Sequence, residues 1–303
     1  MIEHFDLAIA WSWEYDEYFV FRIEKILQSY GLKTYRIEYH NIKETLNALK
    51  RGSLRFYYFL DRASDTEEEF IPIVRFFEKS KTKIFNPNYL TEISNDKATM
   101  HLEFMSAGIN VPYTIIISPY NKGEQISFSL KDLAMLGNPF IIKPANNTGG
   151  GLGVVTGAEN LLDILETRKH LKDDKYLIQE KIIPKTIDGK RAWFRCFFAF
   201  GKTFLTWWDD ITHRYEIVSK IDESKYKLYR LRKVMSIIKK VCKLDFFSSE
   251  IAINNNDKLI VVDYVNDICD MRPQSHAYDG VPDIVIDNII NSLASFIRYK
   301  KVN

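Results

Sequence analysis

Residues 139–153, PFIIKPANNTGGGLG, join a short apolar segment to a glycine-rich run. The apolar residues 140–142 predict a buried strand, and Lys143 ends it. A buried lysine without an anionic partner costs several kcal/mol, so Lys143 requires an anion nearby. The run that follows contains Gly149, Gly150, Gly151 and Gly153. Glycine lets the backbone approach a phosphate closely and direct N–H groups at it, so each feature supports the other.

The glycine run has a second interpretation, because glycine clusters also form the tips of mobile hairpins. It is not a Walker-type loop, since no Gly-Lys-Ser or Gly-Lys-Thr follows it. Lys97, near the start of a predicted helix over 96–107, is a second candidate for an anion contact. A lysine in the first turn of a helix is more often simply solvated.

The segment 176–181 predicts a strand, and polar residues follow its apolar start. Main-chain groups at the end of such a strand can meet the hydrogen-bonding edge of a purine. Isoleucines such as Ile178 and Ile182 can lie against the faces of that purine. The same residues also fit an ordinary strand with an exposed end.

A hairpin predicted over 246–262 brings two carboxylates together. With its tip at Asn255 and Asn256, Glu250 lies opposite Val261, and Asp263 is one diagonal step away on the same face. Two such carboxylates favour a divalent cation held by oxygen ligands, although water-screened acids are the alternative. Asn266 can add a third oxygen only if a bulge or turn follows Asp263, because three residues separate them.

Two arginines need anionic partners. Arg195 lies in the aromatic segment 193–197, where a guanidinium group requires an anion or a route to solvent. Arg272 follows the predicted metal ligands and is placed to meet a substrate carboxylate or phosphate. A structural ion pair fits Arg272 equally well.

The N-terminal part alternates apolar strands with segments of helical spacing, which predicts a small parallel sheet with helices on its faces. Pro87, between two asparagines, marks a domain boundary. Ligands of such sheets bind beyond the carboxyl ends of the strands, where the loops 11–16 and 61–64 are expected. These loops predict one wall of a substrate site, with Arg62 toward an anionic group, or else a core edge and a surface charge.

Composition excludes several classes of protein. The chain of 303 residues is 46% hydrophobic and 14% aromatic, which excludes a largely disordered chain. Its 42 Lys and Arg against 40 Asp and Glu leave no overall field for nucleic acid or anionic lipid, so we expect neither partner. Three widely separated cysteines, a start without basic residues and the absence of a long apolar segment predict a cytoplasmic protein without a membrane span.

Taken in order along the chain, these motifs resemble the ATP-grasp superfamily over residues 86–275. The resemblance implies an ATP-grasp fold of two α+β subdomains, 88–178 and 179–303, preceded by a small Rossmann-like parallel-sheet domain, 1–87. It also implies an ADP-forming ligase that transfers the γ-phosphoryl group of ATP to a carboxylate and lets an amine or similar nucleophile attack the acyl phosphate. The implied cofactors are ATP and Mg²⁺, with Mn²⁺ as an alternative. The implied substrate is an anionic small-molecule or peptide carboxylate.

The resemblance assigns a role to each motif. Lysines and glycines would contact the nucleotide, 179–182 would form the adenine hinge, and Asp188 would bind the ribose. The implied nucleotide-binding residues are Lys97, Lys143, Gly149, Gly150, Gly151, Gly153, Gln179, Glu180, Lys181, Ile182 and Asp188. The implied metal ligands are Glu250, Asp263 and Asn266, and the implied catalytic residues are Arg195 and Arg272.

One motif departs from the family pattern. The family commonly has an acid, one residue and then Asn, whereas Asp263-Tyr264-Val265-Asn266 has two residues between. Either a bulge restores the geometry or Asp267 takes part instead. Two other functions also stay open: a kinase of a small molecule, and a nucleotide-binding regulatory protein without catalysis.

Overall fold

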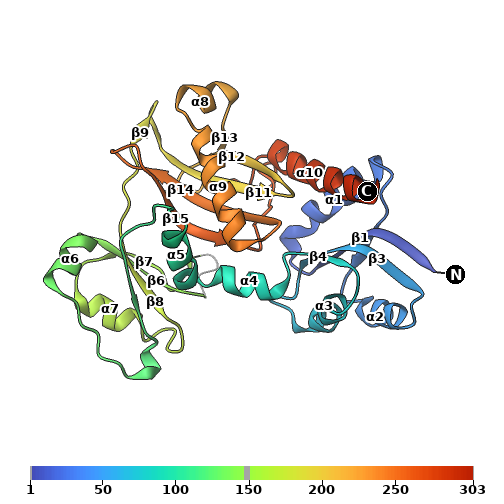
Figure 1. The fold of residues 1–303 in the computed structure, drawn as a ribbon, viewed down its shortest axis with the longest axis horizontal. Helices are drawn as coiled ribbons and strands as arrows, with labels where there is room; N and C mark the ends of the chain where they lie inside the picture. The colour runs from blue at the N-terminus through green and yellow to red at the C-terminus, as the bar shows by residue number, and fades with distance from the viewer. Residues whose placement is uncertain (1, 147–150, 303) are drawn as a thin grey trace.

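The N-terminal part forms a parallel sheet with the strand order β2-β1-β3-β4 (Figure 1). The computed structural model of the protein describes residues 2–146 and 151–302. The strands of this sheet are β1 (Glu3–Trp11), β2 (Thr34–Ile37), β3 (Leu54–Arg62) and β4 (Lys83–Phe85). Its helices are η1 (Glu14–Asp16), α1 (Glu17–Ser29), α2 (Ile42–Lys50), η2 (Glu68–Phe70) and α3 (Ile71–Glu78).

Both faces of β1 are covered, which explains its almost continuous apolar sequence. Leu7 and Ile9 pack in a core cluster with α1, whereas Ala8 and Ala10 pack on the other face with α2 and α3. The predicted small parallel sheet with helices on its faces is therefore confirmed.

The last helix, α10 (Asp283–Val302), completes the N-terminal core. Ile286, Ile290 and Leu293 belong to the same buried cluster as Leu7 and Ile9. Figure 1 shows α10 beside α1, and an ion pair between Arg22 and Asp287 joins the two helices. The division into three domains stays a prediction. Helix α10 belongs to the predicted C-terminal subdomain, 179–303, but it packs in the core of the N-terminal part.

A second sheet is antiparallel, with the strand order β5-β8-β6-β7. Its strands are β5 (Thr114–Ile117), β6 (Phe140–Pro144), β7 (Val155–Ala158) and β8 (Tyr176–Glu180). The helices of this part are α4 (Asn88–Asn95), α5 (Lys97–Ser106), η3 (Tyr120–Lys122), α6 (Leu130–Leu136) and α7 (Leu161–Thr167). Pro87 immediately precedes α4, as its fixed φ favours at a helix start.

The largest sheet has five strands in the order β13-β12-β11-β14-β15. Its strands are β11 (Trp193–Ala199), β12 (Lys202–Trp208), β13 (Tyr215–Ile217), β14 (Phe246–Ile253) and β15 (Leu259–Asn266). A short hairpin, β9 (Thr186–Ile187) and β10 (Lys190–Arg191), precedes it, and the helices here are α8 (Lys220–Lys225) and α9 (Tyr229–Cys242). The apolar stripe Leu231, Met235 and Ile238 of α9 packs on one face, so functional side chains must lie on the other.

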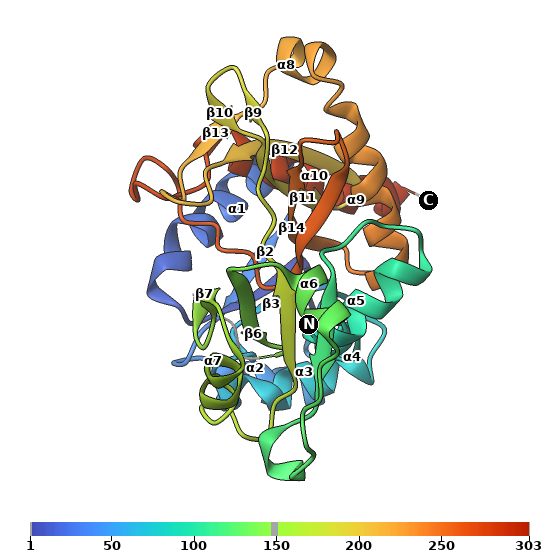
Figure 2. The same cartoon turned by 90° about the vertical axis from the view of Figure 1, so that its left-hand side faces the viewer.

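The two antiparallel sheets lie one below the other when the molecule is turned by 90° (Figure 2). Helix α5 contacts both β15 and β8, so it lies where the two sheets meet. Within the described residues, no helix combines the length and apolarity that crossing a membrane requires.

Candidate active site

Strands β14 and β15 place Glu250 directly opposite Asp263. The predicted pairing of Glu250 with Val261 is wrong, because Val261 pairs with Ile251 and the register then shifts by one residue. The additional residue on β15 is Val262. This bulge brings the two carboxylates closer together than the predicted diagonal arrangement.

A second bulge places Asn266 beside them. Asn266 pairs with Ser248, so three steps along β15 from Asp263 match two steps along β14 from Glu250. Paired residues point to the same face of a sheet, so the side chains of Asn266, Asp263 and Glu250 share one face. The spacing in this chain is therefore compatible with three oxygen ligands on one face.

The alternative ligand, Asp267, is engaged elsewhere. One carboxylate oxygen accepts a hydrogen bond from Asn86 Nδ2 and the other from Thr91 Oγ1, both at 2.8 Å. Burial raises the pKa of Asp267 to about 6. These contacts tie β15 to the segment around α4, and they favour Asp263 over Asp267 as the second acidic ligand.

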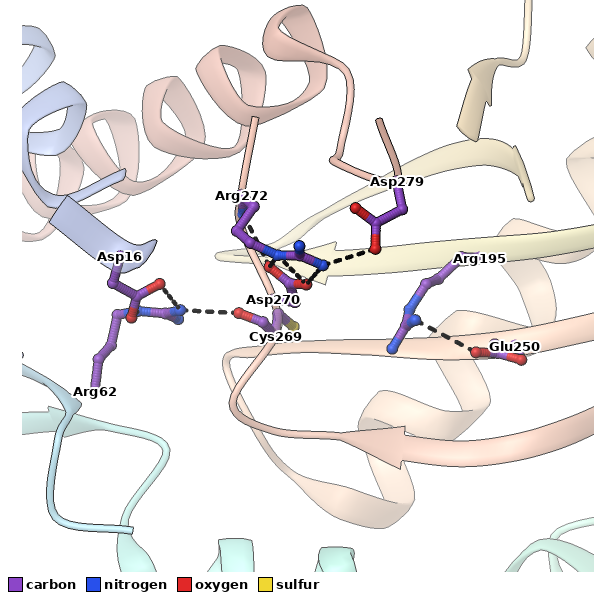
Figure 3. Close-up of polar contacts among 8 residues, drawn as sticks. All are labelled: Asp16, Arg62, Arg195, Glu250, Cys269, Asp270, Arg272 and Asp279. Carbon is purple, nitrogen blue, oxygen red and sulfur yellow. Dashed lines mark hydrogen bonds and ion pairs between the residues drawn. The ribbon is translucent and has the colours of Figure 1, made fainter. Parts of the chain in front are cut away.

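Arg195 is the cross-strand neighbour of Glu250 on β11. Its Nη1 lies 3.4 Å from Oε1 of Glu250, and Nε1 of Trp193 donates to Oε2 at 3.2 Å. Figure 3 shows the Arg195 side chain directed at Glu250. Burial raises the pKa of Glu250 to about 7, with Asp263 adding to the effect and Arg195 opposing it. A cation bound beside Glu250 would favour its ionised form.

Two lysines reach this face, one from helix α5 and one from strand β6. Lys97 begins α5, and its Nζ lies 3.8 Å from Oδ1 of Asp263. Lys143 is the last residue but one of β6, and its Nζ donates to the carbonyl oxygen of Val262 at 3.1 Å. Burial lowers the pKa of Lys143 to about 8, although the charges of Asp263 and Glu250 oppose that shift. The predicted convergence of Lys143 and Glu250 is thus present in the structure.

The electrostatics of Asp263 reflect this convergence. Burial alone would raise the pKa of its carboxyl group, but the positive charges of Lys97, Lys143 and Arg195 bring the pKa below its ordinary value. Three cations and two carboxylates, Glu250 and Asp263, therefore gather from five elements. Such a set can neutralise a polyphosphate and a metal ion together.

The donor chemistry suits a hard divalent cation. Glu250, Asp263 and Asn266 offer only oxygen atoms, which Mg²⁺ and Mn²⁺ prefer. Among the described residues, no group of three or more His, Cys, Asp and Glu side chains forms a metal site. A cation here would therefore use two carboxylates and one amide, with water or phosphate oxygens completing its coordination.

The glycine run is described only in part, since Gly149 and Gly150 lie outside the described residues. Gly151 and Gly153 have left-handed φ angles of 79° and 72°. A Cβ atom on Gly153 would lie 3.0 Å from Cγ of Pro144. The end of the run thus packs on the residue that follows Lys143, and only glycine fits there without strain.

The predicted hinge divides into two halves. Gln179 and Glu180 are still in β8, where β5 and β6 flank the strand on its two sides. Lys181 is exposed, whereas Ile182 is buried and packs with Trp193 on the site face of the five-stranded sheet. The main chain therefore leaves the sheet at Lys181 and Ile182, beside the carboxylates.

Arg272 is held by two carboxylates of its own segment. Its Nη2 lies 2.7 Å from Asp270 and 2.9 Å from Asp279 (Figure 3). These ion pairs raise the pKa of Arg272 further above its ordinary value. The structure places Arg272 in an ion-pair network, the second of the two roles that the sequence left open.

Asp188 lies in the turn of the β9–β10 hairpin. Its carboxylate accepts hydrogen bonds from Lys225 Nζ at 2.9 Å and from the hydroxyl group of Tyr226. Figure 2 shows β9 and β10 near α8, in the upper part of the view. Among the described residues, the structure does not bring Asp188 into contact with Lys97, Lys143 or the candidate metal ligands.

Arg62 is neither a surface charge nor an exposed substrate contact. Its Nε and Nη2 each lie 2.7 Å from an oxygen of Asp16, and Nη2 also donates to the carbonyl oxygen of Cys269 at 2.9 Å. The residue is only 3% exposed. Arg62 therefore joins the N-terminal sheet to the segment after β15, as Figure 3 shows.

Trp193 is a site residue that the sequence analysis did not identify. It lies two residues before Arg195 on the same strand, so the period of two places both side chains on one face. The spacing of two residues from Arg195 could therefore have identified Trp193 as a residue of the same face. The hydrogen bond from its indole to Glu250 depends on β14, which the local sequence does not contain.

No protein-family model and no curated protein matches the sequence. The structure is similar to a RimK-domain ATP-grasp protein from Sphaerobacter thermophilus DSM 20745, with 17% identity, 96% of this chain and 98% of that chain covered, and a TM-score of 0.66. It is also similar to D-alanine–D-alanine ligase from Bacillus anthracis in complex with ATP, with 14% identity, 99% of both chains covered and a TM-score of 0.65. A third similar structure is the ATP-grasp ligase PsnB with a minimal precursor, Mg and ADP, with 14% identity, 94% of this chain and 97% of that chain covered, and a TM-score of 0.60.

Proposed function

This chain has the ATP-grasp fold, and we propose that it is an ATP- and Mg²⁺-dependent ligase that couples a carboxylate to an amine or similar nucleophile. The fold predicted from the ordered motifs is confirmed. The observation that carries the functional proposal is the convergence of Lys97, Lys143 and Arg195 on Glu250 and Asp263. Phosphoryl transfer needs positioning and charge neutralisation above all, and this set supplies both.

In this proposal Lys97 of α5 and Lys143 of β6 hold phosphate oxygens. Arg195 exchanges its contact with Glu250 for the phosphoryl group that is transferred to the carboxylate, which then becomes an acyl phosphate. Glu250, Asp263 and Asn266 would hold the cation. When bound, Mg²⁺ would neutralise charge on the phosphates.

The remaining residues would act around these phosphates. The main chain at Lys181 and Ile182 is free of the sheet and can meet a purine edge, and Gly151 and Gly153 can close over phosphates. Arg272 would act on a substrate only by exchanging one of its carboxylate partners. Asp188 would reach a ribose only if the β9–β10 hairpin moved.

The substrate class follows from the chemistry and from similar proteins. The structures that resemble this chain include one named for ligation of D-alanine and one solved with a peptide precursor. We propose a small-molecule or peptide carboxylate as substrate, with ADP and phosphate as products. The three cysteines are free and buried, which is consistent with a cytoplasmic enzyme.

Replacing Glu250 by Gln tests the proposal. We expect Mg²⁺-dependent ADP release, measured with a panel of carboxylates and amines, to fall at least about a hundredfold, because the variant removes one charged ligand of the cation. Glu166→Gln, an exposed change on α7, is the matched control and should have wild-type activity.

The outcome distinguishes the alternatives. Unchanged turnover in Glu250→Gln would show that the metal assignment is wrong. Nucleotide binding without turnover across the panel would contradict the ligase and favour a regulatory protein. A stable phosphorylated product formed without an amine, detected by phosphorus NMR, would indicate a kinase instead.

A further inference from the structure

Tyr264 is the first of the two residues that separate Asp263 from Asn266, and it is completely buried. Asp263 points to the face that carries Glu250, so the next side chain on the strand points away from that face. There the Tyr264 ring packs edge-on against Phe104 of α5, with ring centroids 5.4 Å apart. The side chain that follows Asp263 therefore packs against α5, on the face of β15 away from the carboxylates.

The Tyr264 hydroxyl group lies in a chain of hydrogen bonds whose direction can be assigned. Thr114 Oγ1 donates to the carbonyl oxygen of Pro112 at 2.9 Å. It therefore accepts from Gln179 Nε2, also at 2.9 Å. The second N–H of Gln179 donates to the Tyr264 hydroxyl at 2.7 Å. The amide of Gln179 has then used both of its donors.

The last bond in the chain joins Tyr264 to helix α5. The Tyr264 hydroxyl lies 2.7 Å from Nδ1 of His101. With its oxygen accepting from Gln179, the hydroxyl group can give its own proton to Nδ1, which then acts as the acceptor. This requires a neutral imidazole protonated at Nε2. Burial, together with the charge of Lys143, lowers the pKa of His101 to about 4, which agrees with a neutral ring.

The ring of Tyr264 contacts Lys143, and its hydroxyl group contacts the helix that carries Lys97. The Nζ atom of Lys143 lies 5.2 Å from the centre of the ring, within the range of a cation–π interaction. His101 stands one helical turn after Lys97 on α5, so the hydroxyl group holds the helix that presents Lys97. The ring thus contacts one lysine directly and the hydroxyl group restrains the other through α5.

We propose that Tyr264 is a positioning residue, which holds Lys97 and Lys143 against the carboxylates of Asp263 and Glu250. Its ring supports the Lys143 ammonium group, and its hydroxyl group fixes α5 and β8 to β15. The inference rests on the proposed function, because the ligand that the lysines are held for is the phosphate chain of ATP.

Two variants separate the ring from the hydroxyl group. Tyr264→Phe keeps the ring under Lys143, and Tyr264→Leu removes both parts. We expect calorimetry with ATP and Mg²⁺ to give an affinity about tenfold lower for Tyr264→Leu, the size of a desolvated cation–π contact, and about threefold lower for Tyr264→Phe. Phe247→Leu, which removes another fully buried ring from the same core cluster, is the control and should keep wild-type affinity.

A spectroscopic measurement tests the hydroxyl network without nucleotide. In protein labelled with ¹⁵N-histidine, the His101 signals should show an unprotonated Nδ1 and a protonated Nε2 at pH 7, and Tyr264→Phe should shift the Nδ1 signal. Wild-type affinity in Tyr264→Leu, equal losses in Tyr264→Leu and Phe247→Leu, or a protonated Nδ1 in the wild type would overturn the inference.

These measurements also keep the two proposals apart. If the wild type binds no ATP, the proposed function fails, and with it the purpose assigned to Tyr264. The histidine spectrum then still decides whether Tyr264 fixes α5 to β15. If the wild type binds ATP and the Tyr264 variants bind it equally well, only the positioning role fails.

Discussion

Replacing Arg62 by Met tests whether this arginine stabilises the fold or binds a substrate. The side chains of Arg62 and Asp16 are each 2% exposed, and two contacts of 2.7 Å join them. Removing one partner of a buried ion pair leaves the other charge unpaired, which costs about 3 to 5 kcal/mol. We expect Arg62→Met and Asp16→Asn each to lower the free energy of unfolding by that amount. The double variant should lose at least about 2 kcal/mol less than the sum, because no buried charge remains.

Urea unfolding followed by tryptophan fluorescence measures these changes, and hydrogen exchange of the β1 amides locates them. Arg75→Met, on the exposed face of α3, is the control and should cost less than about 0.5 kcal/mol. A loss below about 1 kcal/mol in Arg62→Met, or strictly additive single variants, would refute the reasoning. Unchanged stability with a raised KM for the carboxylate would show that Arg62 binds substrate after all.

Two further predictions concern buried groups around the site. Because burial lowers the pKa of His101 to about 4 from about 6.5, its contribution to stability is complete above pH 6.5 and is lost as the pH falls toward 4. Wild type should therefore lose up to about 3 kcal/mol more over this range than His101→Asn, measured by urea unfolding at each pH, and parallel curves would contradict this. Gly153→Ala should lower stability by about 1 to 2 kcal/mol and weaken ATP binding, because φ is 72° and the new Cβ would lie 3.0 Å from Pro144. Gly157→Ala, with no atom within 4 Å of its new Cβ, should change neither quantity in thermal unfolding and calorimetry, and equal effects at the two glycines would argue against the close approach.

The sequence was most informative where a local pattern limits what a residue can do. An apolar run that ends in Lys143 requires a buried lysine with an anion nearby, and the structure gives Lys143 a buried position beside Asp263. Alternating apolar strands and helices in the N-terminal part similarly indicated a parallel sheet, because each strand needs both faces covered.

The sequence was less informative about register. Three steps from Asp263 to Asn266 showed that a bulge was needed if both were to share a face, since side chains alternate along a strand. The first bulge, at Val262, leaves no comparable trace, because it depends on how β15 pairs with β14. A shift of one residue in that pairing turned a diagonal pair of carboxylates into a direct one.

By itself, then, the sequence determined which residues must be buried, which face of a strand they share and which charges need a partner, because these follow from periods of a few residues. Only the tertiary structure decided which residues form the hydrogen bonds and ion pairs with them. Tyr264 meets His101 and Gln179, which lie 163 and 85 residues away in the chain, and Arg62 meets Asp16 rather than a ligand. Such contacts gain their free energy only when distant segments pack together and exclude water, so no local stretch of sequence contains them.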